Sequence, residues 1–338
     1  MWQEWQSLAV SVAKLLNECP AFVGVAVTMT GELADCFTTR AEGVAVILEQ
    51  LTSILPASMV RIYCVDGTWK TVSQSARDPW SVAASNWHGL ARFAIRFVGA
   101  RSCLLFDTGS TTTDLIPIGD GQILTDARTD SQRLQSGALV YTGIERSNVA
   151  GVVSEVSLYG TSCPVMNEQF ATMRDVYLWL RELEDEPECR DTADGKPATR
   201  EAARYRLARI VGEDGSTLAD TDIDRMAEQI AATQTKLVAK AFTKVAASCS
   251  KKTSSAEKKK KPVARAVTKL ESSSHPFECV AISGHGDFLI EAALAVCGWD
   301  GERIRLKELL GDDLSRCAPA YAIATLASEE LSECRPNG

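Results

Sequence analysis

The sequence predicts an α/β protein in which buried strands alternate with amphipathic helices. Residues 21–29, AFVGVAVTM, form a near-continuous apolar run that is typical of a strand buried on both faces. Residues 34–55 and 79–99 carry apolar side chains at helical spacing. Because strand-type and helix-type segments follow one another, we expect crossover connections between strands.

The other elements of the N-terminal part follow from the same patterns. Residues 2–18 place Trp5, Leu8, Val12 and Leu15 on one helical face. Residues 58–72 predict a strand, an Asp-Gly turn and a second short strand. This run of elements leads into the hairpin CLLFDTGSTTTDLIPIGDG at residues 103–121.

The C-terminal part is expected to be more helical. Residues 136–156 predict turns and short strands, and helices are expected over 167–183, after the polar loop that begins at Asp191, and over 219–248. Residues 276–299 predict a strand, a glycine turn and a helix, and residues 303–328 predict a short strand, a loop and a final helix. Residues 174–247 are therefore expected to form a mostly helical block.

These changes of composition predict four segments. An N-terminal α/β lobe covers 1–105, and the hairpin with a mixed or helical second lobe covers 106–247. Residues 248–274 are rich in Lys and Ser, which predicts a disordered surface loop. Residues 275–338 are expected to complete a nucleotide or diphosphate site.

Bulk composition limits the classes of function. With 45% hydrophobic and 24% charged residues, the 338-residue chain can bury the cores of two soluble domains. No apolar run approaches the roughly 20 residues that span a bilayer, and the net charge of -8 disfavours a nucleic-acid surface. We expect a cytoplasmic protein with no signal peptide. The eleven cysteines include no C-x-x-C pair, so they are expected to be reduced core thiols.

The turn DTGSTTTD predicts a phosphate-binding loop. Its backbone N–H groups and hydroxyls can converge on a phosphate, Gly109 lets the backbone approach closely, and Asp107 can hold Mg²⁺ through water. A polar hairpin with no ligand is the structural alternative. The phosphate-binding candidates are Gly109, Ser110, Thr111, Thr112, Thr113 and Asp114.

A second anion-binding element is expected at ISGHGDFL. A strand that ends in Gly284, His285 and Gly286 and opens a helix exposes N–H groups at the helix N-terminus. We therefore place these residues next to a nucleotide or diphosphate. A plain strand-to-helix turn would give the same pattern.

Further polar residues follow predicted strands or begin predicted helices, where sites of open α/β sheets gather. Glu32 or Asp35 could instead cap a helix, His88 could be structural, and the 191–200 loop could be merely solvated. The substrate-binding candidates are Thr28, Thr30, Asn86, His88, Arg128, Asp130, Arg133, Asp194, Lys196 and Arg200.

The hydroxyl-rich hairpin and the later Gly-x-Gly turn resemble the second phosphate motif and the adenosine motif of the actin-like ATPase superfamily. Other segments resemble its hydantoinase/oxoprolinase-like proteins of tetrahydromethanopterin-linked one-carbon metabolism. The matching segments are VTMTGELADCFTTRAEGV (27–44), ASNWHGLARF (84–93), RTDSQRLQSGALVYTG (128–143), DTADGKPATREAARYRLARI (191–210) and LSRCAPAYAIATLA (314–327).

The resemblance implies a two-lobed actin-like ATPase (ribonuclease H-like) fold and a transferase of methanofuran biosynthesis. Such an enzyme condenses a diphosphate-activated furanmethyl substrate with a tyramine-type acceptor, using Mg²⁺ and catalytic carboxylates, here Asp107, Glu32 and Asp35. An ATP-dependent kinase, a hydantoinase/oxoprolinase-type hydrolase and a non-catalytic nucleotide-binding regulator are the alternatives. The partner is expected to be a phosphorylated small molecule, and the sequence leaves the oligomeric state open.

The first phosphate hairpin of that superfamily is absent from the sequence before AFVGVAVTMTGE. An unpaired sheet edge would result. We therefore expect that the true start lies upstream of Met1; the alternative is a site that works with only one of the two phosphate hairpins.

Overall fold

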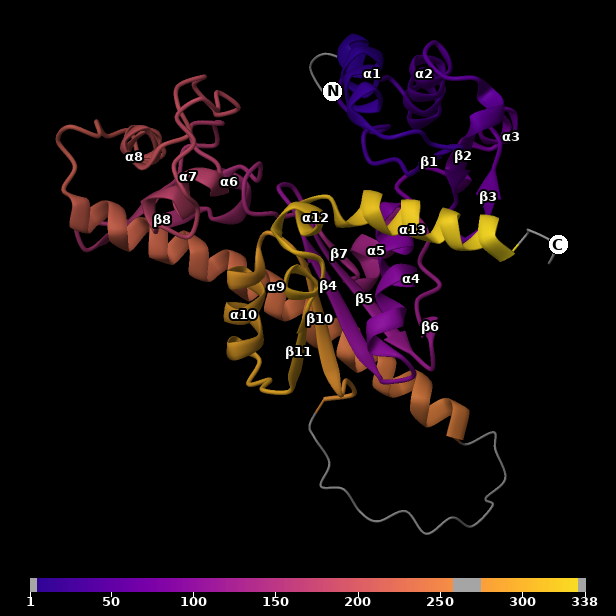
Figure 1. The fold of residues 1–338 in the computed structure, drawn as a ribbon. Helices are drawn as coiled ribbons and strands as arrows, with labels where there is room; N and C mark the ends of the chain where they lie inside the picture. The colour runs from indigo at the N-terminus through magenta and orange to yellow at the C-terminus, as the bar shows by residue number, and fades with distance from the viewer. Residues whose placement is uncertain (1–4, 258–274, 334–338) are drawn as a thin grey trace. The chain divides into compact units, whose positions relative to one another are not determined.

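The computed structural model describes residues 5–257 and 275–333, which form a mixed α/β chain (Figure 1). The chain divides into two compact units. Unit 1 comprises Met1–Arg101, Ile118–Gln132 and Leu310–Gly338, and unit 2 comprises Ser102–Pro117 and Arg133–Leu309. The chain therefore leaves unit 1 and returns to it twice, whereas the boundaries expected from composition follow the sequence in order.

Unit 1 contains a small sheet with the strand order β1-β2-β3. β1 (Val25–Val27) pairs in parallel with β2 (Val60–Tyr63), and β2 pairs antiparallel with β3 (Trp69–Lys70). β1 is only three residues long, lies at the edge of its sheet and is half-buried. The prediction of a long strand buried on both faces was therefore wrong, because an edge strand of a small sheet has one side uncovered.

Helices complete unit 1. After the short turn η1 (Trp5–Ser7) come α1 (Leu8–Glu18), α2 (Arg40–Thr52), η2 (Ala57–Met59), α3 (Val72–Arg77), η3 (Pro79–Ser81) and α4 (Asn86–Val98). The later part adds β6 (Gln122–Ile123), α12 (Asp312–Arg316) and α13 (Ala318–Glu333). α4 packs on α13, and they approach closely at Gly89, where a Cβ would lie 2.3 Å from Ile323 Cδ1.

The start of α2 differs from the expected one. The helix begins at Arg40, and the hydroxyl of Thr39 caps it by accepting a hydrogen bond from Glu42 N at 3.1 Å. Neither Glu32 nor Asp35 is the cap. Residues 34–39 form turns, so both carboxylates lie in the connection between β1 and α2.

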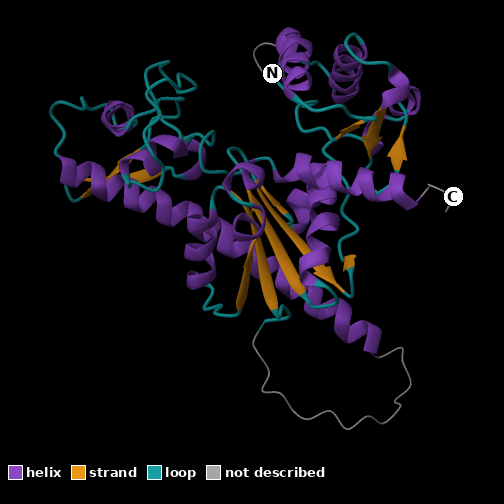
Figure 2. Ribbon diagram, in the orientation of Figure 1, coloured by secondary structure: helices purple, strands orange, loops and turns teal. Residues whose placement is uncertain are grey.

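Unit 2 is built on a sheet in which β10 (Cys279–Gly284) pairs in parallel with both β4 (Cys103–Thr108) and β11 (Glu302–Arg305). β5 (Thr113–Gly119) lies beside β4 and also pairs with β7 (Leu139–Val140). Figure 2 shows these strands side by side. All six β4 residues except Asp107 are buried, so the strand is a core element that ends in the hydroxyl-rich turn.

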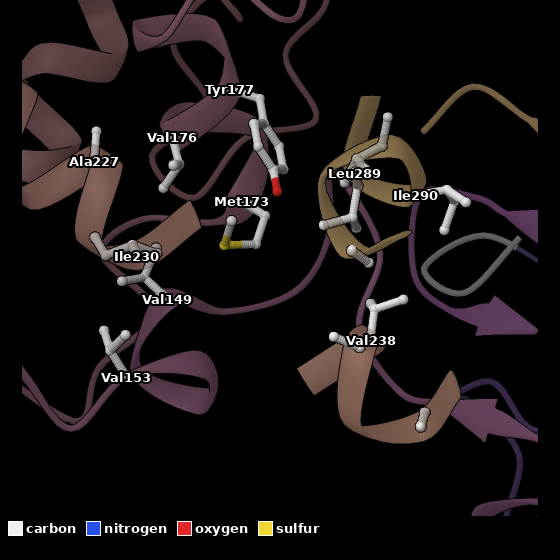
Figure 3. Close-up of a cluster of buried hydrophobic side chains, with 14 of the residues drawn as sticks. Val149, Val153, Met173, Val176, Tyr177, Ala227, Ile230, Val238, Leu289 and Ile290 are labelled. Atoms are coloured by element: carbon white, nitrogen blue, oxygen red, sulfur yellow. The ribbon is translucent and has the colours of Figure 1, made fainter. Parts of the chain in front are cut away.

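The helices of unit 2 surround α9 (Asp220–Glu257), which packs against α10 (Asp287–Val296), α7 (Met173–Trp179) and β8 (Glu155–Leu158). The remaining elements are α5 (Asp130–Ser136), which begins in unit 1, α6 (Val149–Val152), β9 (Thr161–Pro164), α8 (Arg200–Arg209) and α11 (Leu306–Leu310). Figure 3 shows side chains of α6, α7, α9 and α10 meeting in one apolar cluster.

The expected disordered loop over residues 248–274 does not begin at residue 248. Residues 248–257 continue α9, so the predicted loop started too early. Residues 258–274 lie outside the described residues.

Two other expectations can be compared with the structure. The ten described cysteines are thiols, but Cys19, Cys36 and Cys317 are exposed and so are not core thiols. Within residues 5–257 and 275–333, no helix combines the length and apolar character needed to cross a bilayer.

Candidate functional site

The turn between β4 and β5 is held in shape by the segment that follows β7. Gly109 N donates to Thr112 O at 3.0 Å and closes the turn. Ile144 N donates to Gly109 O at 3.1 Å, and the N–H groups of Glu145 and Arg146 donate to Ser110 O at 3.0 and 2.8 Å. The carbonyl groups of Gly109, Ser110 and Thr112 therefore bond to backbone N–H groups, and the hydroxyls of Ser110 and Thr111 lie 3.4 Å from each other.

Gly143 lies directly beneath this turn. A Cβ at Gly143 would lie 2.5 Å from both Gly109 O and Thr111 N, so only glycine permits this approach. By contrast, a Cβ at Gly109 would meet nothing within 4 Å. The open space over Gly109 is where a phosphate could approach the backbone.

The two glycines predict opposite effects of alanine. Gly143→Ala should push the turn out of place and lower the free energy of unfolding by about 1–3 kcal/mol. Gly109→Ala should leave stability within about 0.5 kcal/mol but weaken diphosphate binding roughly tenfold, because its methyl group would occupy the open space. Denaturant titration and calorimetry with inorganic diphosphate would measure both. Unchanged binding in Gly109→Ala would contradict the placement of the phosphate.

The end of β10 contacts the same hairpin from the other side. Gly284 has φ +85°, and a Cβ there would lie 2.1 Å from Thr108 O. His285 N donates to that carbonyl at 3.1 Å. A Cβ at Gly286 would lie 2.4 Å from Thr108 Cγ2. Close packing on β4 therefore requires glycine at Gly284 and Gly286. The same packing places the backbone of His285 against Thr108, at the end of β4 where the turn to β5 begins.

Asp107 is the most perturbed carboxyl group of this site. Protein surrounds it closely although part of its surface stays accessible, and this burial, with the nearby charge of Asp114, raises its pKa to about 7. The charges of His285 and Arg133 act in the opposite direction. Ser283, its neighbour across the strands, also lowers the pKa, but its hydroxyl completes no hydrogen bond of good geometry with described residues.

Asp114 and Arg133 form a buried ion pair behind the turn. Only 2% of Arg133 is exposed, and its guanidinium bonds to Asp114 Oδ1 and, at 3.2 Å, to Ala138 O. We therefore correct two sequence-based assignments. Arg133 is too buried to line a substrate site, and Asp114 supports the hairpin through Arg133.

Gln234, which sequence reasoning missed, also supports the hairpin. Gln234 of α9 is fully buried and donates to Thr142 Oγ1 at 2.7 Å and to Gly143 O at 2.8 Å. Thr113 Oγ1 donates to Thr142 O at 2.9 Å, so this candidate phosphate ligand bonds inward. The sequence pattern could not reveal the contacts of Gln234, because polar residues are ordinary in an amphipathic helix.

Sequence reasoning also missed Glu145, which lies two residues after the matching segment 128–143. Its Oε1 lies 2.8 Å from Nε2 of His285, and its Oε2 pairs with Arg174. Burial alone would raise the pKa of Glu145, but the hydrogen bonds from His285 and Arg174 outweigh it and hold the pKa at about 2.

The donor set fits Mg²⁺ only as an ion shared with a phosphate. Within residues 5–257 and 275–333, no group of three or more His, Cys, Asp or Glu side chains could enclose a metal. Mg²⁺ commonly binds through one or two carboxylates, water and substrate phosphate oxygens. Asp107 offers such a carboxylate next to the turn, and a nearby cation would favour its ionised form.

The candidates in unit 1 form a second polar cluster. Glu32 is 1% exposed, lies 4.0 Å from Arg40, and its Oε2 has no hydrogen-bond partner within the part of the chain that is described. Burial raises the pKa of Glu32. Arg40 pairs with Asp130 at 2.6 Å, and Thr28 bonds to Ser85 at 2.8 Å. Thr30 and Asp35 are exposed. No sequence pattern indicated that Arg40 lies between Glu32 and Asp130 and contacts both.

His88 has the features of a structural histidine. It is 6% exposed, and its Nδ1 lies 3.0 Å from the Tyr63 hydroxyl. Burial, with the charges of Arg128 and Arg92, lowers its pKa to about 4. Arg128 donates to Val65 O at 2.9 Å, and Asn86 begins α4 and is half-buried. The helix therefore holds His88 neutral against Tyr63.

Residues of the 191–200 loop and the start of α8 contact side chains of α7 and α8. Asp194 accepts hydrogen bonds from Arg206 at 3.0 Å and Arg209 at 3.3 Å, and the Arg200 guanidinium lies 4.0 Å from the Trp179 ring centroid. Lys196 is exposed. Figure 1 shows α8 near the start of α9, away from the strands of the sheet. Asp194 and Arg200 are therefore corrected from substrate ligands to scaffold residues.

The fold and the hairpin define an α/β protein with a hydroxyl-rich turn between two buried strands. The chain belongs to the hydantoinase/oxoprolinase family, whose model matches residues 24–330.

Two relatives carry the same name, (4-{4-[2-(gamma-L-glutamylamino)ethyl]phenoxymethyl}furan-2-yl)methanamine synthase. The protein from Methanocaldococcus jannaschii is 29% identical over 309 residues, which covers 91% of this chain and 84% of that one. The protein from Methanococcus vannielii is 27% identical over 234 residues, covering 69% and 93%.

Among solved structures, the activator of the 2-hydroxyisocaproyl-CoA dehydratase from Clostridium difficile with bound ADPNP overlaps with a TM-score of 0.28 at 12% identity. The overlap covers 76% of this chain and 72% of that one. A TM-score this low does not establish a common fold.

Proposed function

We propose that this protein is a transferase of methanofuran biosynthesis that forms an aryl ether between a furanmethyl group and a tyramine-type phenol. The observation that carries the proposal is the β4–β5 turn, where hydroxyls, an open approach over Gly109 and Asp107 gather in one place. The two relatives support it, because the name they share describes a product with a phenoxymethyl-furan linkage.

The reaction proposed for this site is displacement of diphosphate from the furanmethyl carbon. The carbon–oxygen bond to diphosphate breaks, and the electron pair leaves with the diphosphate. The phenol oxygen forms the new bond to that carbon, and its proton passes to a basic group of the protein. Because charge develops on the leaving diphosphate, hydrogen-bond donors placed around it lower the barrier.

The residues of the turn have separate roles in this proposal. Ser110, Thr111 and Thr112 bind the diphosphate through hydroxyls, and Gly109 lets it approach the backbone. Asp107 would hold Mg²⁺, which when bound would neutralise charge on the diphosphate.

The test is product formation from defined substrates. Purified protein is incubated with Mg²⁺, an aminomethyl-furanmethyl diphosphate and γ-glutamyltyramine, and mass spectrometry measures the ether. We expect ether and inorganic diphosphate in equal amounts. A parallel incubation with ATP separates the alternatives: phosphate release from ATP without ether would contradict the transferase and support a kinase or hydrolase.

A further inference from the structure

Glu145, His285 and Arg174 form a connected group next to the phosphate turn. Glu145 uses one carboxylate oxygen for His285, at 2.8 Å from Nε2, and the other for Arg174. Arg174 also donates its Nη1 to Cys189 Sγ at 2.9 Å. The side chain of Glu145 is 17% exposed and that of His285 is 30% exposed, so the imidazole is the member that a small molecule can reach.

The ionisation of Glu145 decides which nitrogen of His285 carries a proton. Two hydrogen-bonded cationic or polar partners hold the pKa of Glu145 at about 2 against the effect of burial. An ionised carboxylate has only acceptor atoms. Nε2 of His285 must therefore be the donor in this contact, and in the uncharged tautomer with that proton Nδ1 is the acceptor nitrogen.

The backbone holds the imidazole at the site. His285 N donates to Thr108 O at 3.1 Å, and the preceding Gly284 pairs with Thr108 in the sheet. Ser283, two residues before His285, pairs with Asp107 across the strands, so His285 and that carboxylate lie at the same end of β4 and β10. Both the main chain and Nε2 of His285 are thus fixed.

We propose that Glu145 is a positioning residue that holds His285 with its proton on Nε2, so that Nδ1 serves as the acceptor atom for the hydroxyl of the second substrate. This inference rests on the proposed function for the identity of that hydroxyl. A neutral Nδ1 accepts a hydrogen bond from a phenol and repels a phosphate oxygen. The imidazole therefore matches the phenolic acceptor rather than the diphosphate.

Nitrogen NMR tests the tautomer without any assay of activity. The chain has three histidines, so ¹⁵N-histidine labelling gives three imidazole patterns, and loss of one pattern in His285→Gln identifies His285. At the pH of the activity assay we expect a protonated Nε2 and an unprotonated Nδ1. A proton on Nδ1, in the other tautomer or in the imidazolium, would overturn the proposal.

Substitution of Glu145 extends this test. Glu145→Gln should give a mixture of tautomers, because the amide can either donate or accept. Glu291→Gln is the matched control, since Glu291 pairs with Arg303 and Arg305 and not with a histidine. An unchanged His285 pattern in Glu145→Gln would show that Glu145 does not set the tautomer. The measurement on the unsubstituted protein stands even where a variant folds poorly.

Kinetics separates positioning from a merely structural role. Glu145→Gln should lower kcat about 100-fold and change KM for the diphosphate substrate less than about threefold. In a His285→Gln background the same substitution should have no further effect on kcat, because Glu145 acts through His285. Multiplicative losses would contradict this. An unsubstituted protein that makes no ether would refute the proposed function, while the NMR result would still decide the tautomer.

Discussion

Asp107→Asn is expected to reduce ether formation at least about 1000-fold and yet to stabilise the protein at alkaline pH. The amide keeps the shape of the carboxyl group but cannot supply the negative charge that attracts a cation. Measurement of kcat at saturating Mg²⁺ tests the first effect. Activity within tenfold of the unsubstituted protein would contradict a role of Asp107 in the reaction.

The stability effect follows from the raised pKa of Asp107, which burial and Asp114 move from 3.8 to about 7. Because the folded protein binds this proton more tightly than the unfolded chain, the stabilising contribution is complete below pH 3.8 and is lost as the pH rises through about 7. Asparagine does not titrate, so the variant avoids this loss.

Urea denaturation across this pH range, without Mg²⁺, measures the difference. We expect the free energy of unfolding of Asp107→Asn, relative to the unsubstituted protein, to increase by about 1–3 kcal/mol between acidic and alkaline pH. Asp300→Asn is the control, because Asp300 is exposed in the same unit. A parallel pH dependence of the Asp107 variant and the unsubstituted protein would contradict the raised pKa.

Arg206→Met is expected to lower the free energy of unfolding by about 3–5 kcal/mol. The guanidinium is fully buried and bonds to Asp175 at 2.6 Å and to Asp194 at 3.0 Å. Its removal leaves Asp175, which is 1% exposed, without its cationic partner. The loss exceeds that of a surface pair because an uncompensated charge stays buried.

Denaturant titration measures this loss, with Arg209→Met as the matched control. Arg209 reaches Asp194 at 3.3 Å, but its side chain is 42% exposed, so its removal should change stability by less than about 1 kcal/mol. Asp194→Asn should leave KM for both substrates unchanged. An increase in KM would restore Asp194 to the substrate site.

The strand-turn-strand form of the hairpin could be predicted from the sequence because it is local. Apolar strands on both sides of D-T-G-S-T-T-T-D determine a strand-turn-strand, and β4 and β5 have that form. The pattern S-G-H-G-D likewise determined a strand followed by a helix, now β10 and α10. Local hydrogen bonding and side-chain periodicity decide such features.

The partners of the hairpin could not be predicted, because they come from distant parts of the chain. The sequence predicted that Arg133 binds substrate, whereas in the structure its guanidinium pairs with Asp114. Glu145 and Gln234 lie in segments whose patterns signal only turns or an amphipathic helix. The role of a charged residue depends on what packs against it, and its own spacing in the sequence does not reveal this.

The sequence by itself determined the α/β class, the family and the turn that could bind phosphate, since each of these depends on residues near one another in the chain. Only the tertiary structure decided which of the candidate charges form ion pairs that support the scaffold. The physical reason is packing between distant segments. Burial raises the pKa of Asp107 and commits Arg133 and Arg206 to ion pairs. Packing also brings Glu145 to His285 across 140 positions of the sequence.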